Sequence, residues 1–174
     1  TLIAEGDSWF DYPFFDVLKS LEDDHGFDVE SVAHKGDTVE DMAFGGGQLD
    51  DFTRRIDKVL RRGERVRAIL LSGGGNDIAG PEFAILLNHA RSNASGLNRK
   101  IVEGVIEERL FDAYVTILGA VTEVCTALSG APIRIVLHGY DYPIPDGRGF
   151  GGGWGPLPGP WLSPGLVQKG YNAL

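Results

Sequence analysis

The chain has 174 residues, of which 43% are hydrophobic and 24% are charged, a composition that suits one globular α/β domain with a substantial core. The formal net charge of −9 argues against nucleic acid as a partner, because phosphate backbones are bound by clustered Lys and Arg. No apolar run approaches the roughly 20 residues that cross a bilayer, so we expect no membrane span. The sequence opens at an apolar strand pattern, so any signal peptide would already be absent, and the compartment stays open.

The spacing of apolar residues predicts strands that alternate with helices along the whole chain. Continuous apolar runs are typical of central parallel strands, and the longer amphipathic stretches between them are typical of crossover helices. In chain order we expect a strand at 2–4, a helix from Asp11-Tyr12-Pro13 to Gly26, a strand over 27–33, a helix over 48–62, a strand over 66–72, a helical stretch over 101–128 and a strand over 133–137.

This alternation predicts a parallel sheet that is covered by helices on both faces. In such sheets, ligands bind beyond the carboxyl ends of the strands. Polar or glycine residues follow each expected strand, so we expect them to meet at one edge of the sheet. These residues are Ser8, Gly36, Asn76 and His138.

The stretch 140–170 differs from the rest of the chain. It contains most of the prolines and many glycines, together with Trp154 and Trp161, and it has no clear periodicity. A segment of this length is usually a functional loop, and the two tryptophans favour a flap that packs on the body of the protein. We therefore predict a single domain over 1–174 with a loop or flap over 140–170.

Gly6-Asp7-Ser8 directly follows the first apolar run. A serine on the turn that leaves a buried strand is where many α/β hydrolytic enzymes keep their nucleophile. Gly36-Asp37-Thr38 follows the second expected strand, and Gly73-Gly74-Gly75-Asn76-Asp77 follows the third. Three such turns are typical of an enzyme active site at the sheet edge.

These three motifs, in this order and each after a strand, resemble those of the SGNH (GDSL-type) hydrolase family. The resemblance implies a flavodoxin-like three-layer α/β/α fold and a carboxylesterase, lipase or acetylesterase that cleaves esters or thioesters of lipids, small acyl groups or acetylated sugars. It also implies that Ser8 is the nucleophile. The oxyanion hole would comprise the backbone N–H groups of Ser8 and Gly36 and the side-chain amide of Asn76.

The last motif of that family, Asp-x-x-His, is absent from this sequence, and the nearest imitation, Glu22-x-x-His25, lies at the far end of the first expected helix. We interpret the chain as an SGNH hydrolase fold without its last strand, its last helix and the catalytic His–Asp pair. No pair of His or Cys has metal-ligand spacing on one helix, so we expect no metal and no cofactor. The expected partner is a small-molecule ester, and the sequence does not give the oligomeric state.

The histidines divide into two groups. His25 and His89 are expected to be solvated, whereas His34 and His138 are expected to lie near the crevice, where a structural role is the more common one for histidine. We regard His34, His138 and Tyr140 as candidate substrate contacts.

Three other residues have structural interpretations. Asp7 and Asp77 flank the catalytic positions, and Asp7 is expected to hold its turn by accepting neighbouring backbone N–H groups. Cys125 lies on an apolar helical face and is interpreted as a buried thiol.

Two other functions stay open. A catalytically silent domain could hold an acyl or sugar ligand in the same crevice. Ser72-Gly73-Gly74-Gly75 could cradle a nucleotide phosphate, but it lacks the Lys-Ser/Thr ending of a P-loop and the spacing of a dinucleotide fingerprint.

Overall fold

The computed structural model describes residues 1–140, 142–149 and 159–172. The chain forms two compact units, which are described separately below. The first unit comprises Thr1–Gly74 and Leu110–Gly139, and the second comprises Gly75–Arg109 and Tyr140–Leu174. That both units belong to one domain stays a prediction.

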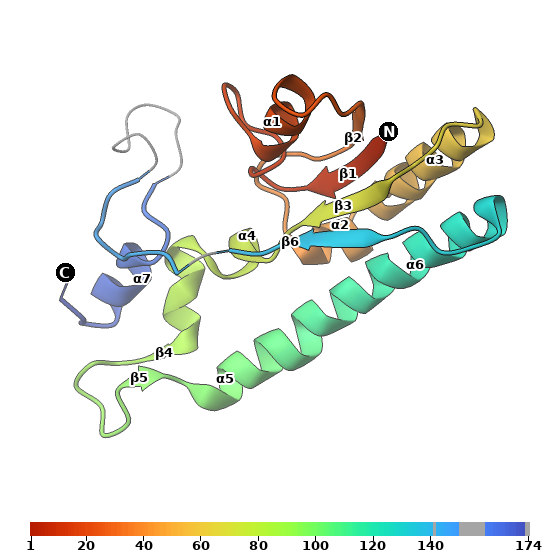
Figure 1. Ribbon diagram of the computed structural model, residues 1–174. Coiled ribbons are helices and arrows are strands. Elements are labelled where there is room, and N and C mark those ends of the chain that lie inside the picture. The colour runs from red at the N-terminus through yellow and green to blue at the C-terminus, as the bar shows by residue number, and fades with distance from the viewer. Residues whose placement is uncertain (141, 150–158, 173–174) are drawn as a thin grey trace. The chain divides into compact units, whose positions relative to one another are not determined.

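The first unit contains a four-stranded parallel sheet in the order β2-β1-β3-β6 (Figure 1). In the register of the sheet, Gly6 pairs with Ser72 and Ser72 pairs with His138, so three strand ends form one row. The strands are β1 (Leu2–Gly6), β2 (Val29–Ser31), β3 (Ala68–Ser72) and β6 (Ile135–His138).

Helices cover both faces of this sheet. On one face, Leu2, Ala4 and Leu70 pack against Phe10 and against Leu18 of α1 (Val17–Asp23). On the other face, the apolar residues of β1 and β3 pack against α2 (Val39–Phe44), α3 (Gln48–Arg61) and α6 (Phe111–Ser129). The result is the flavodoxin-like three-layer α/β/α fold expected from the sequence.

The four strands of this sheet and α3 lie where the apolar pattern predicts them, but the first helix does not begin at Asp11. It begins at Val17, because the side chain of Asp16 accepts a hydrogen bond from the Lys19 N–H and caps the helix. Phe14, which lies inside the helix expected from the sequence, precedes α1 and is exposed. The sequence analysis also missed α2, a short helix that is capped by the side chain of Thr38.

The helical stretch expected over 101–128 is observed as Arg99–Ser129. It comprises α5 (Arg99–Glu103) in the second unit, a π-helical turn over Gly104–Leu110 and α6 in the first. By length and composition alone, this is the one helix among the described residues that could cross a membrane. Its α6 part buries Ala113, Ile117, Val121 and Cys125 in the core of the first unit, as predicted for Cys125.

The second unit contains short elements: α4 (Gly75–Ile78), a 3-10 helix over Gly80–Leu86, the antiparallel pair β4 (Leu87–Asn88) and β5 (Gly96–Leu97), and α7 (Ser163–Gln168). Part of the stretch expected to be a flap is therefore helical, and the Tyr140 and Trp161 rings lie in edge contact, with centroids 5.9 Å apart. Trp154 lies outside the described residues.

Candidate active site

Ser8 lies half-buried in the turn that leaves β1, and Asp7 holds this turn together. The main-chain oxygen of Asp7 accepts the N–H groups of Phe10 and Asp11 at 2.9 and 3.1 Å, and its carboxyl oxygen Oδ1 accepts the N–H of Trp9 at 3.1 Å. A Cβ atom on the preceding Gly6 would lie 2.9 Å from the Phe10 ring and from Ser72, so only glycine fits there. The hydrogen bonds of Asp7 and the close packing at Gly6 therefore fix the position of Ser8.

The loop after β2 is tied to this turn. The His34 N–H donates to the Gly6 carbonyl oxygen at 2.9 Å, and the Lys35 N–H donates to Asp11 Oδ2 at 3.0 Å. Gly36 follows with a φ of +92°, which side-chain-bearing residues rarely adopt. The Gly36 loop and the Ser8 turn are therefore two parts of one hydrogen-bonded structure.

Two backbone donors of this structure have no acceptor in the described part of the chain. Among the described residues, none accepts a hydrogen bond from the N–H of Ser8 or of Gly36, and the Ser8 hydroxyl makes no hydrogen bond either. Unsatisfied backbone N–H groups are uncommon unless a ligand or water can reach them. They are the groups that an oxyanion would need beside a serine nucleophile.

A hydrogen-bonded chain of side chains crosses the sheet directly behind the turn. The Ser72 hydroxyl donates to Asp7 Oδ1 at 3.0 Å, and the same hydroxyl lies 3.2 Å from His138 Nδ1. Asp7 and Ser72 are buried, with 1% and 0% of their surface exposed. The His138 ring packs beside Trp9, with ring centroids 5.1 Å apart, so the chain reaches back to the residue after Ser8.

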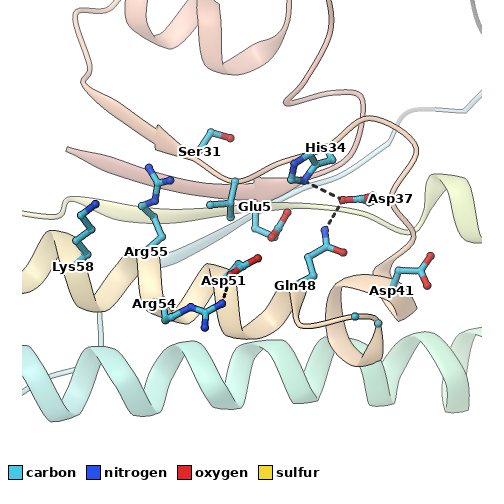
Figure 2. A pocket seen from close by; sticks show the side chains of 13 residues that line it. Glu5, Ser31, His34, Asp37, Asp41, Gln48, Asp51, Arg54, Arg55 and Lys58 are labelled. Carbon is cyan, nitrogen blue, oxygen red and sulfur yellow. Dashed lines mark hydrogen bonds and ion pairs between the residues drawn. The ribbon is translucent and has the colours of Figure 1, made fainter.

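A second polar group occupies a cleft of 920 Å³ beside β2 and α3 (Figure 2). In this cleft the Gln48 amide donates to Asp37 Oδ2, and Glu5 of β1 is among the lining residues. Charged side chains of α3 line the far side, where Arg54 pairs with Asp51 and Arg55 pairs with Glu30. No three His, Cys, Asp or Glu side chains in the described part of the chain are grouped as metal ligands.

Burial dominates the electrostatics of Glu5, whose side chain is 99% removed from solvent. Burial raises the pKa of Glu5 from 4.5 to about 8, and the negative charges of Asp37 and Asp51 add to the shift. The Gly6 N–H and the Gln48 side chain lower the pKa, but by less than burial raises it. Burial also raises the pKa of Asp37.

The structure brings some of the predicted site residues together. Ser8, Gly36 and His138 all belong to the first unit, at the carboxyl ends of its strands. Asn76 and Tyr140 belong to the second unit. The side chain of His34 is 72% exposed and lies 3.8 Å from Asp37, on the side of the second polar group rather than beside Trp9.

The sequence analysis missed Glu5 and Gln48, and it considered Ser72 only as part of a possible phosphate cradle. Glu5 had a detectable signal, because it is the one charged residue inside the apolar run of β1. Ser72 ends β3, and its only sequence signal was its position before the glycine-rich turn. Gln48 had no signal, because a glutamine in the first turn of a helix is ordinary.

Among solved structures, protein YxiM from Bacillus subtilis is distantly similar to this chain. The sequence identity is 16% and the TM-score is 0.42, and the alignment covers 97% of this chain. The chain spans 40% of the length of YxiM. No family model and no curated protein matches the chain. The family assignment therefore stays a proposal that depends on the motifs and on the geometry of the strand ends.

Proposed function

We propose that the chain is a serine ester hydrolase of the SGNH type, with Ser8 as the nucleophile. The observation that carries this proposal is the pair of backbone N–H groups, of Ser8 and Gly36, that have no acceptor among the described residues and flank a serine at the end of β1. The hydrogen bonds from the Gly36 loop to Gly6 and Asp11 hold these donors in place before substrate arrives. Such preorganised donors are the largest single contribution to many acyl-transfer reactions.

In the proposed reaction, Ser8 Oγ bonds to the carbonyl carbon of an ester while a base removes the hydroxyl proton. The carbonyl oxygen becomes negative and accepts hydrogen bonds from the N–H groups of Ser8 and Gly36. The bond to the alcohol oxygen then breaks, and the proton goes to that oxygen. Water attacks the acyl-serine in the same way and releases the acid. The side-chain amide of Asn76 is the expected third donor, on the strength of the family resemblance.

The test is covalent labelling of Ser8 with a fluorophosphonate, followed by intact mass. We expect a single adduct that is lost in Ser8→Ala and kept in Ser95→Ala, a matched change at an exposed serine. Hydrolysis of p-nitrophenyl acetate should fall by at least about 10⁴-fold in Ser8→Ala. A chain that folds but takes no adduct would contradict the proposal and would favour a domain that only binds its ligand.

A further inference from the structure

The alternation of β1 places Glu5 on the sheet face that α3 covers. Leu2 and Ala4 belong to the apolar cluster on the α1 side, whereas Ile3 packs in the cluster that contains residues of α3. Successive side chains of a strand point to opposite faces, so Glu5 shares the face of Ile3. A carboxyl group therefore lies on a face whose other strand residues are apolar.

One oxygen of this carboxyl group lacks a partner. Oε1 of Glu5 accepts the Gly6 N–H at 2.8 Å, but Oε2 is buried and has no hydrogen-bond partner in the described part of the chain. Gln48 lowers the pKa of Glu5, but its amide donates to Asp37 Oδ2. Buried polar atoms are nearly always hydrogen-bonded, so an orphaned one calls for an explanation. Because Glu5 also lines the cleft beside β2 and α3, a ligand in the cleft can supply the missing donor.

A polar stripe of α3 forms one side of this cleft (Figure 2). Its members recur every three or four residues, the spacing that places side chains on one face of a helix. They are Gln48, Asp51, Arg55 and Lys58. Gln48 and Asp51 are the two that act on Glu5. The N-terminus of α3 attracts negative charge, and Asp50 and Asp51 in its first turn already supply that charge.

The end of the cleft at Glu5 is negative. After burial, the charges of Asp37 and Asp51 raise the pKa of Glu5 further. Burial also raises the pKa of Asp37, and the charge of Asp41 adds to that shift. Arg54 lines the same cleft but pairs with Asp51. A nearby cation would lower the pKa of both raised carboxyl groups, so this end of the cleft has a place for a positive charge.

We propose that this end of the cleft binds the primary ammonium group of a small organic ligand. An ammonium group carries one positive charge and three N–H donors. The three acceptors are Glu5 Oε2, the carboxylate of Asp37 and the side-chain carbonyl oxygen of Gln48. A metal ion fits less well, because no three His, Cys, Asp or Glu side chains of the described chain are grouped as ligands. Ser8 and Gly36 are not among the lining residues, so the inference goes beyond the proposed function and does not depend on it.

Binding of the ammonium group is coupled to the proton of Glu5. The bound charge favours the ionised carboxylate, so the ligand displaces a proton wherever Glu5 of the free chain is protonated. The affinity therefore rises with pH up to about 8, the pKa of Glu5, and levels off above it. A Glu5→Gln chain separates this proton from the other charged and titratable groups near the cleft. These are His34, Asp37, Asp41, Asp51, Arg54, Arg55 and Lys58.

The experiment titrates the chain with n-butylamine and follows the backbone N–H signals of Gly6 and Gln48 by NMR, in buffers free of primary amines. We expect saturable binding with a Kd on the order of 1 to 10 mM, because so small a ligand cannot bind tightly. The affinity should rise about tenfold between pH 7 and pH 9. Tetramethylammonium has the same charge without N–H donors, and it should bind at least about tenfold more weakly.

Three variants locate the bound group. At pH 9, Glu5→Gln should weaken butylamine binding at least about tenfold, and its affinity should no longer rise with pH. Glu22→Gln, a matched change at an exposed position of α1, and Ser8→Ala should bind as the unaltered chain does. Should Glu5→Gln fail to fold, Asp37→Asn replaces it, because the Asp37 side chain is 23% exposed and tolerates the change more readily.

Three results would overturn the inference. The first is the absence of a saturable shift at Gly6 and Gln48 up to about 50 mM butylamine, a concentration several times the expected Kd. The second is equal affinity for butylamine and tetramethylammonium, which would indicate only diffuse attraction to a chain of net charge −9. The third is unchanged affinity in folded Glu5→Gln, or in Asp37→Asn where that variant replaces it, because the ammonium group would then bind elsewhere.

Discussion

Glu5 and Asp7 lie two residues apart on one strand end, and both are 99% buried, but their surroundings differ. The carboxyl of Asp7 accepts hydrogen bonds from the Ser72 hydroxyl and the Trp9 N–H, and it stabilises the turn that carries Ser8. Glu5 faces α3 and receives the Gly6 N–H, but burial outweighs this donor and raises its pKa to about 8. These two neighbouring carboxyl groups therefore differ in the hydrogen bonds that they accept and in the elements that they face.

The difference lies in the donors that the chain provides. Burial of an ionised carboxyl group costs little free energy only where protein hydrogen bonds replace those that it made with water. Without such bonds, burial favours the protonated form. Asp7 obtains its donors from its own turn and from the adjacent strand β3, which the register of the sheet fixes. Glu5 shares Gln48 with Asp37, and the negative charge of Asp37 raises its pKa further. The hydrogen bonds of Asp7 hold the turn that carries Ser8, whereas Glu5 keeps its proton to a higher pH than an ordinary carboxyl group does.

The largest expected effect is the pH dependence of stability that Glu5 imposes. The folded state keeps the Glu5 proton up to about pH 8, whereas the unfolded chain releases it near its ordinary pKa of 4.5. Between these values the folded state binds more protons at Glu5, so the contribution of Glu5 to the free energy of unfolding is highest below pH 4.5 and falls as pH rises. The contribution of Glu5 to the free energy of unfolding changes by about 1.4 kcal/mol per pH unit. Over the range between the two pKa values this amounts to several kcal/mol. Urea unfolding at a series of pH values measures it.

Glu5→Gln should remove this slope, because the amide has no proton to lose and nearly the same shape. Glu22→Gln, a matched change at an exposed position of α1, should leave the slope in place. Asp37, whose pKa is also raised, leaves a smaller dependence of the same sign in the Glu5→Gln chain. Equal slopes in all three chains would show that Glu5 is not the group that holds the proton.

The next effect concerns Asp7. Asp7→Ala removes the acceptor of the buried Ser72 hydroxyl and of the part-buried Trp9 N–H, so we expect the free energy of unfolding to fall by about 3 kcal/mol. Fluorophosphonate labelling of Ser8 should slow as well, because the turn loses the side-chain bond that shapes it. Chemical unfolding and labelling rates on the same preparation measure both effects.

Asp23→Ala is the matched control, since Asp23 is an exposed carboxylate on α1. It should change stability by no more than about 0.5 kcal/mol. If Asp7→Ala were as stable as Asp23→Ala, the hydrogen bonds of Asp7 would contribute nothing net, and the contrast with Glu5 would disappear.

The sequence predicts the parts of the site that depend on position along a strand. Ser8 and His138 each follow an apolar run, and parallel strands bring such positions to one sheet edge. The same pattern predicts β3 and α3 almost to the residue. These features are local, so a single sequence contains the information for them.

The parts that depend on contacts distant in sequence could not be predicted. The bond between Ser72 and Asp7 spans 65 positions, and the bond between Ser72 and His138 spans 66. The first helix begins at Val17 rather than Asp11, because the Asp16 cap competes successfully with Pro13 as a starting point. The burial of Glu5 depends on α3 packing across β1, which the alternation of β1 alone does not show.

The smallest expected effect tests the loop that lies between the two networks. Gly36 lies near the Ser8 turn. The next residue, Asp37, accepts a hydrogen bond from Gln48, and its charge acts on Glu5. A Cβ atom at Gly36 would meet nothing within 4 Å, so Gly36→Ala changes only the cost of its φ of +92°. We expect the free energy of unfolding to fall by about 1 kcal/mol. Gly26→Ala is the matched control, because Gly26 has a φ of +67° and the same open space.

Gly26→Ala should have a similar stability cost but leave labelling of Ser8 unchanged, because Gly26 follows α1, far along the chain from either network. Gly36→Ala should slow labelling, because the relaxed loop moves the Gly36 N–H from the place where it meets the oxyanion. Equal labelling rates in the two variants would mean that Gly36 supplies a turn and no donor. The oxyanion hole would then have to be sought elsewhere, and the link between the Gly36 loop and the nucleophile turn would be structural only.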